Sequence, residues 1–202
     1  MGNIGILGRA RSGKDTAAQW LIEHRGYRRI AFADPLKAVA LKLDPIAWTH
    51  RTGWGEDGTG VVRIAELVRD VGWERAKETP EVRRILQELG AAMRDVDPDV
   101  WIRPARAAIL EANEAGVPVV VTDVRYPNEV TALRGLGFHL IHVERPGTPH
   151  LDHPSEHAVT PEDADFRIVN SGPVGSLYGE IEAIASTVYD IESRRHYARS
   201  LS

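Results

Sequence analysis

The segment Gly8-Arg-Ala-Arg-Ser-Gly-Lys-Asp-Thr16 holds the residues whose types and spacing suit phosphate chemistry. Its outline is one glycine, four residues, a second glycine and a lysine, with Gly8, Gly13 and Lys14 in these places. Glycines permit a tight turn in which successive backbone N–H groups, including that of Ser12, point at phosphate oxygens. A lysine in this place reaches the β- and γ-phosphates of a nucleotide. The segment therefore predicts a binding site for the phosphates of ATP.

The residue after the lysine departs from the usual motif, which has Ser or Thr there to bind Mg²⁺. Here Asp15 takes that position and Thr16 follows it. Either Asp15 approaches the metal, directly or through water, or Thr16 replaces the usual hydroxyl. The alternative for the whole segment is a glycine-rich turn that only caps a helix. An apolar run before it and a helical pattern after it favour the phosphate site.

These residues need a scaffold of strands and helices, and the periodicity of the chain supplies one. Short apolar runs predict strands at 3–7, 29–32, 117–121, 138–143 and 166–169. One helical pattern begins near Thr16. Others cover 35–43, 63–71, 81–93, 100–115, 128–136 and 174–195. Asn128 is the expected N-cap of the helix at 128–136. Strands that alternate with helices predict a three-layer α/β sandwich of P-loop kinase type, with about five parallel strands.

The length of 202 residues suits a single domain, 1–202. The helical stretch interrupts the alternation, so we expect a helical insertion over about 44–115 that opens with an irregular loop at 44–60. The polar segment 146–161 is a candidate lid.

Three charged residues follow predicted strands. Asp123 comes after the valine-rich strand, where open α/β sheets bind ligands and P-loop proteins hold Mg²⁺. Arg125, two residues later, suits a phosphate, although a surface ion pair with Glu129 is the simpler alternative. Arg145 ends another strand just before the candidate lid and is assigned to ATP binding.

Composition excludes several classes of function. The chain has no cysteine and a formal net charge of −4. A broad nucleic-acid surface is therefore not expected, and no apolar run is long enough to predict a membrane partner. These features predict a cytoplasmic protein. His153-Pro-Ser-Glu-His157 matches a zinc-protease pattern, but prolines crowd it and no helical pattern surrounds it, so a solvated loop is favoured.

Four segments resemble the phage deoxynucleoside monophosphate kinases. The first is Ala10-Arg-Ser-Gly-Lys-Asp-Thr16, because that family also has Asp after the lysine. The others are Phe32-Ala-Asp-Pro-Leu-Lys37, Leu86-Gln-Glu-Leu-Gly90 with Arg94 and Trp101, and Asp123-Val-Arg-Tyr-Pro-Asn-Glu129. Animal phosphomevalonate kinases share the Ser-Gly-Lys-Asp loop, so the loop alone leaves the acceptor open.

The resemblance implies a deoxynucleoside monophosphate acceptor, with ATP and Mg²⁺, and a location in the host cytoplasm if the chain is phage-encoded. A homodimer is left open. It implies that Lys14, Arg11, Asp123 and Arg125 are catalytic and that Asp15, Thr16 and Asp123 are the metal ligands. The implied acceptor-binding residues are Asp34, Leu36, Lys37, Arg83, Gln87, Arg94, Trp101 and Glu129.

Three other functions compete with this one. A kinase for another phosphorylated metabolite, such as phosphomevalonate, would use the same loop. A nucleotide-binding module without catalysis would also use it. A GTPase is disfavoured because the chain contains no Asn-Lys dipeptide, with which the guanine motif begins.

Overall fold

The computed structural model describes residues 2–51, 59–148 and 158–201. The chain divides into two compact units, one made of Met1–Phe32 with Ile102–Ser202 and the other of Ala33–Trp101. The second unit therefore begins before residue 44 and ends before residue 115, the two bounds that the sequence predicts for the insertion. The helix near Pro35 belongs to the second unit, and the helix that begins at Ile102 belongs to the first.

The first unit contains a five-stranded sheet in the order β2-β5-β1-β6-β7, and every neighbouring pair is parallel. The strands are β1 (Ile4–Leu7), β2 (Arg28–Ile30), β5 (Val119–Val121), β6 (His139–Glu144) and β7 (Phe166–Val169). The prediction of about five parallel strands is confirmed. Because β1 lies in the middle, the carboxyl ends of β5 and β6 lie beside the start of the glycine-rich segment.

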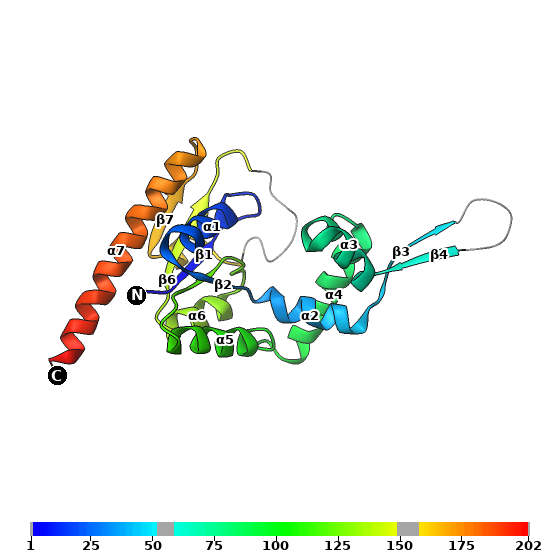
Figure 1. Cartoon of the computed structure of the whole chain (residues 1–202), viewed down its shortest axis with the longest axis horizontal. Helices are drawn as coiled ribbons and strands as arrows, with labels where there is room; N and C mark the ends of the chain where they lie inside the picture. The colour runs from blue at the N-terminus through cyan, green and yellow to red at the C-terminus, as the bar shows by residue number, and fades with distance from the viewer. Residues whose placement is uncertain (1, 52–58, 149–157, 202) are drawn as a thin grey trace. The chain divides into compact units, whose positions relative to one another are not determined.

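Helices cover both faces of this sheet (Figure 1). They are α1 (Lys14–Arg25) and α7 (Val174–Ser200) on one face, and α5 (Ile102–Glu114) and α6 (Pro127–Gly135) on the other. Side chains alternate along a strand, so Ile6 packs with α1 and α7 while Leu7 packs with α5 and α6. The three-layer P-loop kinase fold is thereby confirmed, with an apolar core on each side of the sheet.

The second unit consists of three helices and a β-hairpin. These are α2 (Ala33–Leu43), β3 (Ile46–Arg51), β4 (Thr59–Arg63), α3 (Ile64–Ala76) and α4 (Pro80–Val96). Ala47, Ile64 and Val82 form its small buried core. Within this unit the hairpin extends beyond α3 and α4 (Figure 1).

The irregular loop expected at 44–60 was wrong, because β3 and β4 pair there as antiparallel strands. Ile46–Arg51 has little alternation of apolar and polar residues, so a period-two pattern does not mark it. Its hydrogen-bond partners come from Thr59–Arg63, beyond a glycine-containing segment that hid the hairpin.

Two helix boundaries also differ from expectation. Tyr126, not Asn128, is the N-cap of α6, because Pro127 occupies the first helical position. α3 ends at Ala76, beyond the predicted end at Val71, although Gly72 has φ 75° and breaks the helical geometry between them.

The 146–161 lid remains a prediction, since 149–157 lies outside the described residues, and so does His153-Pro-Ser-Glu-His157. Pro161, the last residue of the candidate lid, begins a short 3₁₀ turn, η2 (Pro161–Asp163). Within the described ranges, no helix is both long and apolar enough to span a bilayer.

Tyr27 ties the first strand to the turn after α1, and this contact should make stability depend on pH. Its hydroxyl donates to the Gly2 carbonyl at 2.8 Å. Burial raises the pKa of Tyr27 to about 12, and nearby Arg25 opposes the shift. The neutral phenol therefore contributes stability below pH 10, and that contribution is lost as pH rises from about 10 to about 12.

We expect the free energy of unfolding of the wild type to fall by about 2–3 kcal/mol more than that of Tyr27→Phe across this pH range. Urea denaturation at closely spaced pH values measures both. If the free energies of unfolding of the two proteins change in parallel with pH, burial does not shift the pKa of the Tyr27 phenol.

Candidate active site

The phosphate loop joins β1 to α1 through two glycines that no other residue could replace without strain. Gly8 has φ 132°, and a Cβ there would lie 2.1 Å from the Val143 carbonyl oxygen. Gly13 has φ 108° and is the N-cap of α1. Since glycine has no side chain, none caps the first-turn N–H groups of α1 from this position. The loop thus presents a helix N-terminus suited to an anion.

A buried amide at the carboxyl end of the edge strand β7 holds this loop in place. Asn170, directly after β7, is 7% exposed, and its Nδ2 donates to the Ser12 carbonyl at 2.9 Å. A Cβ on Gly13 would come within 2.5 Å of the same nitrogen. The Lys14 ammonium donates to the Arg9 carbonyl across the loop. The shape of the loop is therefore fixed by contacts as well as by its own glycines.

The loop opens on a cavity of about 680 Å³. Six of the residues predicted from the sequence line it: Gly8, Ser12, Lys14, Asp123, Arg125 and Arg145. The rest of the described lining consists of Arg9, Val124, His142, Glu144 and segments 146–148 and 159–161. Four of these side chains are cationic and two are anionic, so the cavity suits a polyanion such as a nucleotide phosphate chain.

The end of β5 presents Asp123 and Arg125 through defined hydrogen bonds. The Phe32 backbone N–H donates to Asp123 Oδ1 at 3.0 Å. Glu129 Oε2 accepts from the backbone N–H groups of Arg125 at 2.7 Å and Tyr126 at 3.1 Å. Glu129 is 3% exposed. The buried carboxylate of Glu129 thus holds the Arg125 turn in place, and its contact with the acceptor stays a prediction.

The remaining predicted residues of the loop do not line the cavity. Arg11 has φ 64°, rare outside glycine, and its side chain is exposed, as is that of Asp15. Thr16 is half-buried. Among the described residues, no three His, Asp or Glu side chains form a metal cage. Asp15, Thr16 and Asp123 nevertheless fit Mg²⁺ in chemical type, since this ion needs few carboxylates when phosphates and water complete its shell.

His142 is the unexpected titratable group of the cavity. Burial lowers its pKa, Glu144 opposes that change, and the charges of Arg167, Lys14 and Arg9 add to it. Glu144 is itself engaged, because Arg167 Nη2 donates to its two carboxylate oxygens at 2.8 and 2.9 Å. The imidazole is thus held neutral near neutral pH.

The second unit gathers several of the residues expected to bind an acceptor. Lys37 lies 3.6 Å from the carboxylate of Asp34, and its ammonium is 5.9 Å from the centre of the Trp73 ring. Arg83 and Gln87 are exposed on α4, four residues apart and so on one helical face. These side chains offer charge and hydrogen bonds on the surface of one unit.

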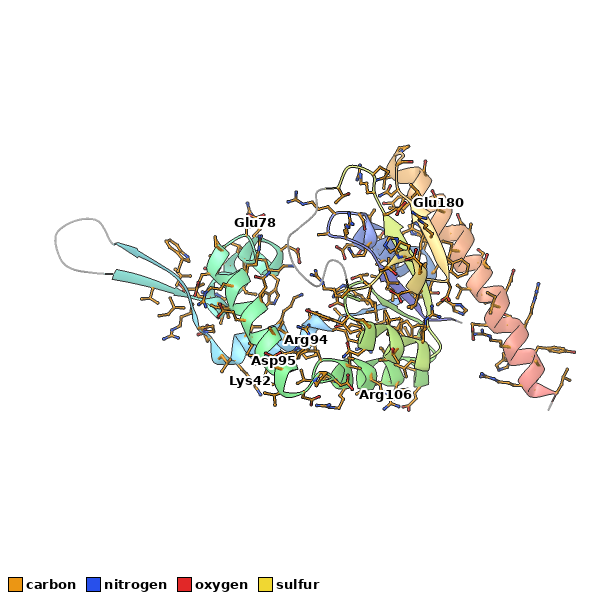
Figure 2. All side chains as sticks on the ribbon, turned by 180° about the vertical axis from the view of Figure 1, so that it is seen from behind. Lys42, Glu78, Arg94, Asp95, Arg106 and Glu180 are labelled. Atoms are coloured by element: carbon orange, nitrogen blue, oxygen red, sulfur yellow. The ribbon has the colours of Figure 1, made fainter. Side chains whose placement is uncertain are left out.

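Gly90 is the point where the other acceptor candidates meet. Its carbonyl accepts from Arg94 Nη1 at 3.2 Å and from the Trp101 indole at 3.3 Å. A Cβ at this position would lie 3.2 Å from Leu36. Trp101 is only 3% exposed, as is typical of an aromatic side chain that fills a core. Figure 2 shows Arg94 and Asp95 in the carboxyl-terminal part of α4.

Comparison with known proteins decides the family. The family model of deoxynucleotide monophosphate kinases matches residues 55–181, more than half of the chain. The chain belongs to this family. The resemblance read from the sequence is confirmed, and the chain is a nucleotide kinase, that is, a phosphotransferase.

Individual relatives are distant. A protein of Acanthamoeba polyphaga mimivirus, provisionally named a deoxynucleotide monophosphate kinase, is 29% identical over 203 residues, with 88% of this chain and 93% of the relative covered. The deoxynucleotide monophosphate kinase of Enterobacteria phage T4 is 31% identical over 105 residues. This match covers 50% of this chain and 44% of the T4 protein. This kinase thus spans less than half of the T4 enzyme. A sugar kinase from Janibacter aligns with a TM-score of 0.48 at 14% identity, over 95% of both chains.

Asn170, His142 and Trp73 are candidate functional residues that the sequence analysis did not assign. Asn170 follows a strand at its carboxyl end, the signal that selected Asp123. His142 is a polar residue within the apolar strand β6, which is also detectable. Trp73 has the helical spacing of a core residue, and nothing in the pattern of α3 distinguishes it.

Replacing Asn170 tests whether the brace shapes the phosphate loop. Asn170→Ala leaves the Ser12 carbonyl without its donor, which costs about 1–3 kcal/mol. We expect nucleotide affinity to fall by about tenfold or more in isothermal titration calorimetry. The neighbouring Ser171→Ala is the control and should bind as the wild type does. Equal affinity in all three proteins would show that the loop keeps its shape unaided.

Proposed function

We propose that this kinase transfers the γ-phosphoryl group of ATP to a deoxynucleoside monophosphate, giving ADP and the diphosphate. The observation that carries the proposal is the cavity, in which the glycine loop, Lys14, Asp123, Arg125 and Arg145 line one space of about 680 Å³. Membership of the deoxynucleotide monophosphate kinase family supports the acceptor.

Phosphoryl transfer depends on alignment and on neutralisation of charge rather than on covalent catalysis. Lys14 would contact the β- and γ-phosphates, while the N-terminus of α1 contributes its partial positive charge. Arg125 and Arg145 would approach the transferring group from the other walls of the cavity. Arg11 is exposed on the loop outside this lining, so its side chain would have to reorient to contribute. The acceptor phosphate is already ionised, so no strong general base is required.

Mg²⁺ supplies bridging and neutralisation of the phosphate oxygens when it is bound with the nucleotide. Asp123 would hold it from the end of β5, with Asp15 or Thr16 on the loop side. The hydrogen bond from the Phe32 N–H orients the Asp123 carboxylate for this role.

The second unit would recognise the acceptor. Lys37 and Arg94 supply cations for its phosphate, and Asp34, Arg83 and Gln87 supply exposed polar groups for its sugar and base. Leu36 and Trp101 are buried, so we assign them to the support of these side chains. Arg94 is oriented by its hydrogen bond to the Gly90 carbonyl.

A panel of acceptors with coupled detection of ADP tests the proposal. We expect ADP release that depends on at least one of the four common deoxynucleoside monophosphates, with slower or no turnover of phosphomevalonate. If phosphomevalonate is the only acceptor that is turned over, the proposed acceptor is wrong and phosphomevalonate takes its place. ATP binding without turnover of any acceptor would indicate a binding protein.

Lys14→Met should reduce kcat by about 100-fold or more, because it removes a cation from the charge that develops on the phosphates. Lys42→Met, at an exposed lysine on α2, is the matched control and should retain kcat. Circular dichroism should show both variants folded. Near-normal turnover of Lys14→Met would refute this mechanism.

A further inference from the structure

His142 is a polar residue within a strand that is otherwise a core element. β6 lies between β1 and β7, and His142 is paired in register with Leu7, the last residue of β1. Side chains alternate, so Ile141 and Val143 enter the core beneath α1 and α7, whereas His142 faces the opposite side. There it is 9% exposed and lines the phosphate cavity.

The two ring nitrogens of His142 have different surroundings. Nδ1 is sealed from solvent and has no hydrogen-bond partner in the described part of the chain. Native structures leave few buried polar atoms in this state, and an unpaired acceptor is less unusual than an unpaired N–H. The proton of the neutral ring therefore belongs on Nε2. Since the ring lines the cavity and Nδ1 is sealed, Nε2 is the polar atom that can reach a ligand.

The charges around the ring favour the same arrangement. Lys14 from α1, Arg9 from the loop and Arg167 from β7 all oppose a positive charge on the imidazole. Glu144 on the same strand and Glu162 in η2 favour the charged ring, but Arg167 is paired with both carboxylate oxygens of Glu144. A cationic imidazole would also bury an unpaired Nδ1–H. His142 is thus arranged as a neutral donor among cations.

We propose that His142 Nε2–H donates a hydrogen bond to a phosphate oxygen of the nucleoside triphosphate bound at the glycine loop. This inference rests on the proposed function, because it takes the phosphate cavity to hold ATP. The lysine and arginines supply charge over a range of positions, while a ring fixed in a strand offers one donor in one direction. His142 is therefore a positioning contact for the phosphate chain.

Two isosteric substitutions separate this role from packing. The carboxamide nitrogen of His142→Gln reaches the place of Nε2, and that of His142→Asn reaches the place of Nδ1. We expect His142→Gln to bind ATP within about threefold of the wild type by isothermal titration calorimetry. His142→Asn and His142→Leu should each bind about tenfold more weakly or worse, as for loss of a hydrogen bond to a charged group.

His139 provides the matched control on the same strand. It is buried to a similar degree, but its Nε2 lies 2.9 Å from Glu192 and it does not line the phosphate cavity. His139→Gln and His139→Asn should leave ATP affinity unchanged. Thermal unfolding without nucleotide accompanies each titration, so that a loss of affinity is compared with any loss of stability.

The outcomes distinguish the inference from the function on which it rests. If the wild type binds ATP and the three His142 variants bind it equally well, the hydrogen bond is refuted while the kinase assignment stands. If Gln, Asn and Leu weaken ATP binding equally, the role of the ring is packing and the inference also fails. A wild type that does not bind ATP would overturn the proposed function itself.

Discussion

The parallel pairing of β1 with β5 on one side and β6 on the other is the constraint on which the site depends. Parallel strands end at the same edge of a sheet, so this pairing brings the glycine loop, Asp123 and His142 to one cavity. A slip of one residue in either pairing would exchange the two faces of a strand. The apolar cores on both faces resist such a slip, because Ile6 and Leu7 would each be moved to the wrong layer.

The phosphate loop also illustrates how close packing converts a flexible sequence into a rigid receptor. Gly8 passes the backbone of Val143 at a distance that leaves no room for a Cβ, and Gly13 passes the amide of Asn170 in the same way. Glycine is conformationally free in the unfolded chain, so the loop has no preferred shape of its own. The Asn170 amide after β7 and the close approach to Val143 of β6 help to fix that shape, and so link the loop to the integrity of the sheet.

The difference between local sequence patterns and tertiary contacts explains which features could be predicted from the sequence. The strands, the helices and the glycine loop carry local patterns, and the residues expected to contact phosphate at Lys14 and Arg125 lie in the cavity. The β3–β4 hairpin was missed because its pairing joins segments across a glycine-rich stretch. The burial of Glu129 and the brace from Asn170 were missed for a related reason: each depends on a tertiary neighbour that no periodicity reveals.

The proposed phosphate site and the proposed acceptor site consist of different kinds of chemical group. The proposed phosphate site consists of backbone N–H groups and glycines, and a Cβ at Gly8 or Gly13 would clash with its neighbours. The acceptor candidates are side chains on a small unit, and a Cβ at Gly90 would lie within 3.4 Å of both Leu36 and Arg94. A substitution there can change the shape of the acceptor surface without touching the loop that binds phosphate. Acceptor preference can therefore diverge within this family while the transfer chemistry stays fixed, and the two must be measured separately.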